Sequence, residues 1–532
     1  MALDRAVTAA ARRRIRVAGA LAAAALLLTA CPAGEPKRPA GSPTATPLPT
    51  TPPEGEIRLA WPHEPATLNP FVRGGESPSA RALLRPLWPP LFAAGPGGEA
   101  TPWLVDRVLS EEPLSVRVAL RADAVWSDGE PIKASDVVFT WKTIVDPASK
   151  AIAPAGYDAI ASVTAESQTI VAITFKHAVP AWTDLFSAGL GVLPEHALAG
   201  KGIGEIGAWP VSGGPFVLER YTRGLEMVLR ATPQPWRVRA RVRTIRVMFV
   251  PDSTTAIQLL RAGRVDVLGP YSSPDFSRRL TAEDGVAVST DTGAVWTGLV
   301  LNTASSILSD ARVRQAAAFA VDRAAIVEGL VRGEGGGLGR PFVYPEAGSE
   351  GVPYDPQRAA QLLAEAGFAE RRGGTRAKGG TPLEISIALS GGDDLAQRVV
   401  RAVFAHLNAA GFAVNLVSLE DEALWRDWLP SSRFQAALVT FADPPGGALR
   451  DRYHSAEVMP GGLNVPRVGD PALDAGIEAG DAARVAAELE RLAPVVPLWR
   501  ASVPAAARGG VQGVRAVASA DGMLVLAHDW AI

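Results

Sequence analysis

Cys31 is the residue of this chain with the clearest chemical potential, because it is the one cysteine among 532 residues. It follows Leu28-Thr29-Ala30, at the end of an apolar run that begins at Val17. Four arginines, Arg12, Arg13, Arg14 and Arg16, precede that run. A charged head, a short apolar core and small residues in this order are typical of a secretory signal. The apolar run is shorter than the roughly 20 residues that cross a bilayer.

The segment Leu28–Cys31 resembles the bacterial lipobox, in which cleavage leaves the cysteine as a lipid-bearing N-terminus. We therefore expect residues 1–30 to be a lipoprotein signal peptide and Cys31 to be the site of lipidation, with palmitate among the attached chains. A secretory signal with a chance cysteine is the alternative. With Cys31 used for lipid, no thiol remains for a structural disulfide or for haem or zinc bound through thiolates.

The patterns of the common catalytic sites are missing from the sequence. There is no H-E-x-x-H, no G-x-S-x-G and no G-x-x-x-x-G-K-[ST]. Gly202–Gly207 matches G-x-G-x-x-G by letter, but Trp209-Pro210 follow where a phosphate-binding helix would have to begin. The six histidines are far apart, so no metal site and no cofactor are expected. Paired carboxylates such as Asp393-Asp394 are interpreted as surface charge, and the chain is expected to be a binding protein rather than an enzyme.

The charge balance excludes another class of partner. The chain carries 53 Lys and Arg against 55 Asp and Glu, a net charge of −2. Residues 1–30 hold five Arg and one Asp, a contribution of +4, so the remainder stands at −6. Nucleic-acid binding requires a strongly basic face and is not expected. A mildly acidic body also gives no reason to adhere to an acidic membrane, so the lipid must supply the anchoring.

A tether and a large folded body follow the signal. Residues 32–55 hold eight Pro in 24 positions, a composition that stays extended. From Ile57 onward short alternating runs predict strands, and amphipathic runs between them predict helices. The predicted strands are Ser115–Leu120, Ile170–Phe175, Ile245–Val250 and Leu383–Leu389. The predicted helices are Asp355–Ala366, one that starts after Ser309 and continues past Ile326, and Ala396–Ala410.

Several segments, in order along the chain, resemble family 5 of the extracellular solute-binding proteins, the oligopeptide and dipeptide binders of ABC importers. The strongest is Trp126–Phe139 (WSDGEPIKASDVVF), which is similar to the family's W-x-D-G-x-P signature. The others are Thr67–Pro70, Ser212–Leu218, Leu260–Asp266, Asn302, Asp310–Ala316, Val321–Arg323, Tyr354–Gly367, Asn464, Asp470–Asp474 and Pro494–Leu498. Most of these residues have structural roles, Trp126 and Phe139 as core residues and Asp128-Gly129 as a turn. They indicate the fold and not the position of a ligand.

The resemblance implies an α/β fold of the type II periplasmic-binding-protein class: two lobes, an extra subdomain in lobe I, and two hinge crossovers. Lobe I is then expected at 57–297, lobe II at 298–500 and a C-terminal return to lobe I at 501–532, after a lipidated linker at 31–56. It implies a monomer that captures a peptide or other small molecule between the lobes and delivers it to an ABC permease and ATPase. Such a protein acts outside the cytoplasm, here held on the outer face of the membrane, or in the periplasm, through Cys31.

The resemblance also implies where the ligand lies. Gly74, Gly75 and Glu76 fall where lobe I backbone lines a peptide. Thr440-Phe441-Ala442-Asp443 falls where the family often has W-x-x-D, whose Asp pairs with the ammonium terminus of the peptide. Asp443 is then a ligand contact, with a turn before Pro444-Pro445 as the alternative. Thr440 replaces the usual Trp and removes an aromatic wall.

Two other functions remain open at this point. The same fold can serve signalling or cell-envelope interaction without a transporter. An exported hydrolase with a Ser, His and Asp brought together by folding is the third possibility. Non-peptide ligands, such as nickel complexes, haem, sugars or opines, also occur in the family, although the sparse histidines disfavour a metal.

Overall fold

Among the residues that the structure describes, ten strands form the largest sheet, in the order β17-β16-β18-β12-β19-β11-β1-β10-β9-β8. Their bounds are β1 Glu56–Trp61, β8 Phe216–Thr222, β9 Glu226–Ala231, β10 Thr244–Phe249, β11 Val267–Leu268, β12 Val286–Leu301, β16 Glu384–Ser390, β17 Ala413–Leu419, β18 Ala436–Ala442 and β19 Val495–Arg508. Parallel pairs (β1 with β10 and β11, β16 with β17 and β18) lie on either side of the antiparallel pair β12 and β19. The sheet is therefore mixed, as the alternation of strands and helices in the sequence predicts.

This computed structural model describes most of the chain from Pro52 onward. The described residues are 52–72, 75, 77–94, 100–149, 151–152, 156–177, 179, 182–187, 191–205, 211–271, 276–331, 352–442, 449–460, 462–517 and 522–532. Residues 48–532 belong to one compact unit. The signal peptide, Cys31 and the Pro-rich segment expected from the sequence lie outside the described residues. Within the described part, no helix has the length and apolarity needed to cross a bilayer.

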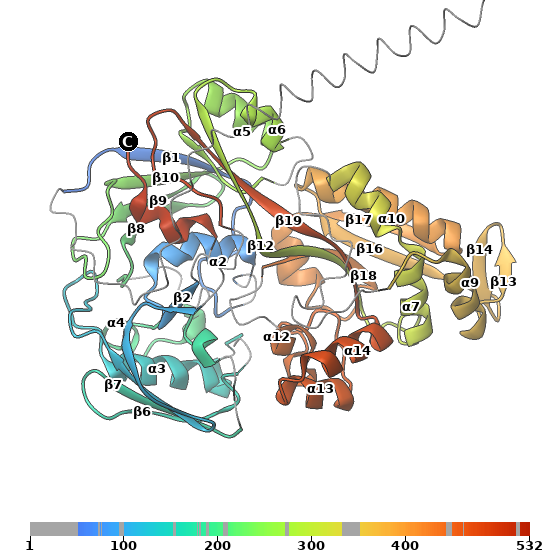
Figure 1. Cartoon of the computed structure of the whole chain (residues 1–532), viewed down its shortest axis with the longest axis horizontal. Coiled ribbons are helices and arrows are strands. Elements are labelled where there is room, and N and C mark those ends of the chain that lie inside the picture. Colours follow the sequence, from blue (N-terminus) through green and yellow to red (C-terminus); the bar gives the residue numbers. More distant parts are fainter. Residues whose placement is uncertain are drawn as a thin grey trace, which may run out of the picture. The chain divides into compact units, whose positions relative to one another are not determined.

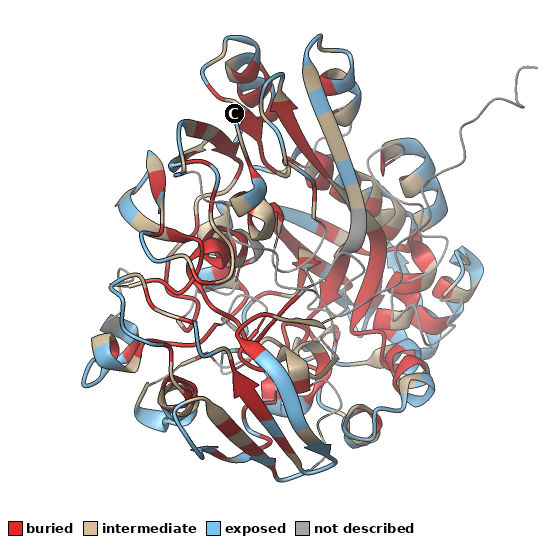
Figure 2. Ribbon diagram, turned by 60° about the vertical axis from the view of Figure 1, so that its left-hand side comes forward, coloured by how far each residue is buried: buried red, intermediate tan, exposed pale blue. Residues whose placement is uncertain are grey.

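The long strands β12 and β19 join two separate cores (Figure 1). At one end β19 pairs with β11 at Ala506 and Ala507, next to a core that includes Ile57, Leu59 and Val247. At the other end β12 pairs with β18 between Val295 and Leu301, next to a core that includes Leu299 and Ile385. We call the end with β1 and β8–β11 lobe I and the end with β16–β18 lobe II. Buried residues run along the sheet strands, whereas the outer turns of the surrounding helices are exposed (Figure 2).

Lobe I carries further sheets and helices around its core. The antiparallel sheet β4-β5-β7-β6 packs with α3, and β2 pairs with β3. The strands are β2 Phe92–Ala94, β3 Ala100–Pro102, β4 Val105–Glu112, β5 Ser115–Leu120, β6 Ile160–Ala165 and β7 Ile170–Phe175. The helices are α2 Pro78–Leu84, α3 Ala134–Val145, α4 Glu195–Leu198, α5 Ser253–Arg261 and α6 Phe276–Thr281. Strands β5 and β7 have the predicted bounds, and β10 and β16 are shifted by one residue from their predicted bounds.

Lobe II has helices on both faces of its part of the sheet, because two cores flank it. One core holds residues of α7, α9 and α10, and the other holds residues of α13 and α14. The helices are α7 Ala311–Ala320, α8 Arg323–Ile326, α9 Pro356–Glu365, α10 Asp394–Ala410, α11 Asp421–Ala423, α12 Leu449–Tyr453, α13 Pro471–Glu478 and α14 Ala482–Leu492. A small sheet contains β13 Glu370–Arg372, β14 Thr375–Lys378 and β15 Thr381–Pro382.

Helix ends in lobe II follow local chemistry. Asp355 caps α9 by accepting a hydrogen bond from Arg358 N, and Gly411 ends α10 with φ 108°. Both ends were predicted from the sequence. The prediction of one continuous helix after Ser309 is wrong. Helix α7 ends at Ala320, since Asp322 accepts a hydrogen bond from Ala325 N and starts α8 as a new N-cap.

The Trp126–Phe139 signature builds the junction between a turn and α3. The Trp126 side chain is 1% exposed, and its Nε1 donates to Asp136 Oδ2 over 3.4 Å. Asp136 also accepts from the backbone N–H of Lys133 and of Glu195, at 2.8 and 2.9 Å. Gly129 has φ 96°, which suits the predicted turn. These contacts give the signature the structural role that we expected, in lobe I and away from the crossovers.

Candidate functional site

A row of three side chains crosses the two lobe-connecting strands and β18. Trp296 on β12 lies directly opposite Phe441 on β18 and Arg500 on β19. Directly opposed residues of antiparallel strands have side chains on the same face. The Trp296 and Phe441 ring centroids are 4.7 Å apart, with an angle of 38° between the planes. Trp296 and Phe441 are 2% and 3% exposed, so they form a buried aromatic pair on the strands where the lobes are connected.

The guanidinium of Arg452, on helix α12, lies over this aromatic pair. Its guanidinium carbon lies 4.1 Å from the centroid of Phe441 and 5.8 Å from that of Trp296. A guanidinium over aromatic faces is attracted by the ring quadrupole and keeps its N–H donors. The arrangement places a positive charge in a fixed position at the crossover. Such a group can bind a carboxylate through paired hydrogen bonds.

Thr440 faces the other side of the sheet from Phe441, because successive strand residues alternate. Its Oγ1 is hydrogen-bonded to Thr297 Oγ1 at 2.8 Å, and Thr297 is 2% exposed. The hydroxyl pair therefore satisfies two polar groups where the family commonly has a Trp. Of the three predicted contact residues that the structure describes, Gly75, Thr440 and Phe441, only Phe441 belongs to the Trp296 row.

Gly75 belongs to the loop before α2, and its backbone N–H donates to Val72 O at 3.0 Å. A Cβ at Gly75 would lie 1.9 Å from Asn69 O, so the close backbone approach admits only glycine here. Close packing against the Asn69 backbone therefore accounts for the glycine at position 75. The predicted contacts Gly74, Glu76 and Asp443, and the predicted lipidation site Cys31, lie outside the described residues.

The lobes also touch through an ion pair near α12. Arg450 of α12 is paired with Asp158, which precedes β6 of lobe I. The Nε of Arg450 lies 3.7 Å from Glu457 Oε1. Burial raises the pKa of Glu457 to about 8, helped by the nearby Asp451 and Asp158 and opposed by Arg450. We call Arg450, Asp158 and Glu457 the Arg450 contact.

A second contact joins the lobes at the β8–β9 turn. Arg223 of that turn is paired with Glu422 of α11, and Glu422 also binds Arg426. Nearby, Asp393 caps α10 by accepting from Ala396 N at 2.8 Å. Burial raises the pKa of Asp393 to about 6, and the charge of His63 from lobe I opposes this rise. We call Arg223, Glu422 and Arg426 the Arg223 contact.

Sequence reasoning missed Trp296, Arg452 and Arg500. An isolated Trp in a strand and two arginines gave no signal, since Trp296 is 145 positions from Phe441 and 204 positions from Arg500. The described residues hold no group of three or more His, Cys, Asp or Glu side chains that suits a metal ion. The described side chains offer a cation over two aromatic rings, beside the strands that connect the lobes, and ion pairs that join the lobes.

Comparison with known proteins agrees with this architecture. Residues 99–450 match the family described as "Bacterial extracellular solute-binding proteins, family 5 Middle". Protein XP55 of Streptomyces lividans is 27% identical over 433 residues, which cover 78% of this chain and 76% of that protein.

Two solved structures show the same fold. The oligopeptide-binding protein AppA from Bacillus subtilis, in complex with a nonapeptide, has a TM-score of 0.80 and 19% identity, and the match covers 90% of this chain and 99% of AppA. NikZ from Campylobacter jejuni, in complex with Ni(L-His), has a TM-score of 0.79 and 20% identity, with 90% and 100% covered. The two-lobed type II fold expected from the motifs is therefore confirmed. The family model spans most of the chain, and this protein belongs to family 5 of the bacterial extracellular solute-binding proteins.

Proposed function

We propose that this protein is a lipid-anchored receptor outside the cytoplasm, which captures peptides or a similar small solute between its lobes and delivers them to an ABC importer. The observation that carries the proposal is the Arg452 guanidinium over Trp296 and Phe441, beside the strands that connect the lobes. Hinge closure around a ligand is an established motion of two-lobed binding proteins. Curated relatives named putative ABC transporter peptide-binding proteins, from Brucella species, are 26% identical over 378 residues and support the transport role.

In this proposal Asp443 pairs with the ammonium terminus of a peptide, and Arg452 binds a carboxylate of the ligand. Backbone groups at Gly74 and Gly75, with the Glu76 side chain, face the peptide from lobe I. Thr440 and Phe441 shape the lobe II wall, Phe441 through its contact with Arg452. Lobe I spans 57–297, lobe II 298–500, and residues 501–532 return to lobe I.

Membrane attachment is part of the proposal. Residues 1–30 are removed, Cys31 receives the lipid, and residues 31–56 separate the folded body from the membrane. We expect the C31S variant to lose membrane attachment while the folded body still binds its ligand. Mass spectrometry of the N-terminal peptide would show the lipid mass on Cys31, and an unmodified peptide from membrane-bound protein would contradict the proposal.

The main experiment is native mass spectrometry of the protein purified without refolding. We expect added mass that disappears on denaturation and is sequenced as short peptides. A single non-peptide mass would replace the peptide assignment but keep the binding role. A protein that carries no ligand and binds none from peptide pools would contradict peptide capture.

A matched pair of ligands then tests Asp443. D443N is expected to weaken binding of a peptide with a free N-terminus by at least about tenfold, the loss of a charge-assisted hydrogen bond in a desolvated site. The same peptide with an acetylated N-terminus should bind both variants alike. E365Q, at an exposed carboxylate of α9, serves as the control. Equal losses for both peptides would assign Asp443 to the turn before Pro444.

The alternative is a lipoprotein of the same fold that acts in signalling or cell-envelope interaction without a transporter. It predicts ligand binding without solute uptake. Deletion of the gene in a strain that depends on uptake of the identified ligand separates the two functions, since only the transport role predicts a growth defect.

A further inference from the structure

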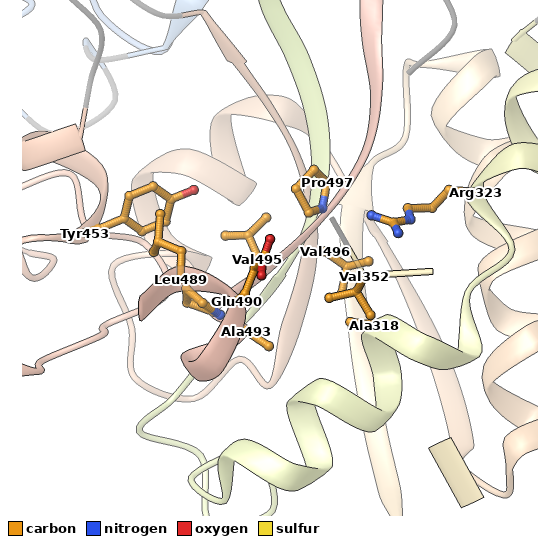
Figure 3. Close-up of a pocket in the computed structure, with 11 residues that line it drawn as sticks. Ala318, Arg323, Val352, Tyr453, Leu489, Glu490, Ala493, Val495, Val496 and Pro497 are labelled. Carbon is orange, nitrogen blue, oxygen red and sulfur yellow. The ribbon is translucent and has the colours of Figure 1, made fainter. Parts of the chain in front are cut away.

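A small pocket of lobe II lies beside β19. Its lining residues include Ala318, Val352, Leu489 and Val496 (Figure 3). The cavity measures about 30 Å³, which is the room of about one water molecule. This pocket is therefore too small for a second solute, and the surface of lobe II is where a further partner can bind.

Strand β17 is the last strand of the ten-stranded sheet on the side of lobe II. Its seven residues, AVNLVSL, include no charged residue and no proline. The pairing of β17 with β16 is continuous from Ala413 to Leu419, without a bulge. Native proteins usually protect such an edge with charges, prolines or bulges, because an unprotected edge pairs readily with another strand.

The other edges of the two larger sheets are protected. β8 carries Glu219 and Arg220, and its register shifts between Leu218 and Arg220. β4 contains several charged residues and two register shifts. The register of β6 shifts between Ile160 and Ser162. Among the described edges of these two sheets, β17 is thus the one that has neither charges nor a bulge.

The backbone groups of β17 point alternately toward β16 and away from it. Ala413 N donates to Leu383 O at 2.8 Å, and Leu419 O accepts from Gly391 N at 2.7 Å. Both ends of β17 therefore face β16. Since successive residues of a strand turn their N–H and C=O groups to opposite sides, the groups that point outward belong to Val414, Leu416 and Ser418.

Leu416 is at the centre of this outward-facing edge. It is 39% exposed, and Asn415 and Ser418 are exposed as well. Val414 N donates to Asn408 Oδ1 at 3.3 Å. The outward backbone groups of Leu416 and Ser418 have no hydrogen-bond partner among the residues that the structure describes. The edge therefore offers backbone donors and acceptors to another strand.

The two ends of β17 carry opposite charges. The strand is followed by Glu420, which is exposed, and by Asp421. At the other end, Arg376 N donates to Gly411 O, just before β17. Arg371 is the cross-strand neighbour of Arg376 and is exposed. An antiparallel pair of two such strands brings the acidic end of each to the basic end of the other.

We propose that β17 pairs antiparallel with β17 of a second copy of this chain, in a two-fold dimer that replaces the monomer implied by the family resemblance. The axis passes between Leu416 and Leu416 of the second copy, which exchange both backbone hydrogen bonds. Ser418 N donates to Val414 O of the second copy. In this register Asp421 lies opposite Gly411, next to the basic end. The pairing does not depend on the ligand, because β16 and β18 separate β17 from β12.

Disulfide cross-linking tests the register. In the proposed pair the two Leu416 Cα atoms are about 5.5 Å apart, a distance that a disulfide spans. The two Ser418 Cα atoms are about 13 Å apart along the strands, which is too far. Membranes that carry the full chain are treated with copper phenanthroline. L416C should give at least about tenfold more disulfide-linked dimer than S418C, and the parent protein measures any cross-link through Cys31.

Sedimentation velocity of the full chain in detergent measures the dimer without a cross-link. L416K places two like charges directly opposite each other and should raise the dissociation constant at least about tenfold. L225K, at a leucine of the β8–β9 turn that is 60% exposed, should dimerise like the parent protein. E420K should also weaken the dimer, and R371E in the same chain should restore it, because the charges are then exchanged between the two ends.

Three results would overturn the proposal. Equal cross-linking of L416C and S418C would mean that the copies meet by random collision. A parent protein that sediments as a monomer at every concentration, together with L416C that forms no disulfide-linked dimer, would mean that the edge stays unpaired. A cross-link from L416C to a different protein would mean that the edge serves another partner than a second copy.

Discussion

The Arg450 contact and the Arg223 contact both join the lobes, but they differ in how much water reaches the charges. The Arg450 side chain is 18% exposed and that of Glu457 only 10%, although Asp158 is 51% exposed. In the Arg223 contact, Arg223 is 58% and Arg426 48% exposed, and Glu422, which binds both, is 27% exposed. Exposed ion pairs contribute little, whereas removal of one partner from a buried pair leaves an uncompensated group. The two contacts should therefore contribute unequally to stability.

The two contacts also differ in the protonation of their carboxyl groups. Glu457 has a pKa above its usual range because desolvation outweighs the attraction of Arg450. Near neutral pH it is a protonated acid beside a cation rather than half of an ion pair. Arg450 is thus balanced mainly by Asp158, across the lobe boundary. The stability contributed by the buried contact should therefore depend on pH, and that contributed by the exposed contact should depend on salt.

The largest effect is expected for R450A. We predict a loss of about 3 kcal/mol in the free energy of unfolding, because the change removes the packing of a side chain that is only 18% exposed, together with the ion-pair partner of Asp158. Urea unfolding at pH 7 measures it. R426A, at an exposed arginine of the other contact, is the control and should lose less than 1 kcal/mol. Equal losses for the two variants would remove the distinction between the contacts.

E457Q should change how stability depends on pH. The folded-state pKa of Glu457, about 8, is above its value in the unfolded chain. The folded state therefore holds the proton more tightly, and stability falls as the pH rises between the unfolded and the folded pKa. E457Q removes this titration. Between pH 5 and pH 6.5 the stability of E457Q relative to the parent protein should therefore rise by about 2 kcal/mol. Parallel pH profiles of the two proteins would show that Glu457 is ionised in the folded state.

A smaller pH effect is expected for Asp393, the N-cap of α10. Its raised folded pKa, about 6, predicts that it contributes a loss of stability between about pH 4 and pH 6. D393N should remove this slope and keep the cap of α10, since Asn is a good N-cap. D393A should also remove the slope but lose about 1 kcal/mol with the cap. A slope that persists in D393N would assign the titration to another group.

The smallest effect is expected for the exposed ion pair. R223A should lose less than 1 kcal/mol at low salt, and the difference from the parent protein should shrink further in 1 M sodium chloride. R450A is the comparison, and its loss should persist in the same salt. Chemical unfolding of both variants at two salt concentrations is sufficient. A large, salt-independent loss in R223A would show that this contact is the stronger one.

The sequence predicted elements whose signals are local. Asp355 and Gly411 set helix ends through their own side chain or backbone conformation, and both ends are confirmed. The break between α7 and α8 was missed, because the apolar spacing continues across Asp322 while its capping hydrogen bond does not show in the pattern. The motif order indicated the family and the two-lobed fold. The ligand contacts Asp443, Gly74 and Glu76 stay predictions.

By itself the sequence determined the family of the protein, because each of the family motifs is read within a short window. The lipobox-like segment and the Pro-rich stretch are equally local, and the membrane anchor that they indicate stays a prediction. Only the tertiary structure decided which charges meet. Asp158 and Arg450 are 292 positions apart, and Arg223 and Glu422 are 199 apart. Likewise, Arg452 reaches the rings of Trp296 and Phe441 through the folding of three elements. Which charged side chains lie side by side depends on the neighbours that folding provides, and no local pattern encodes them.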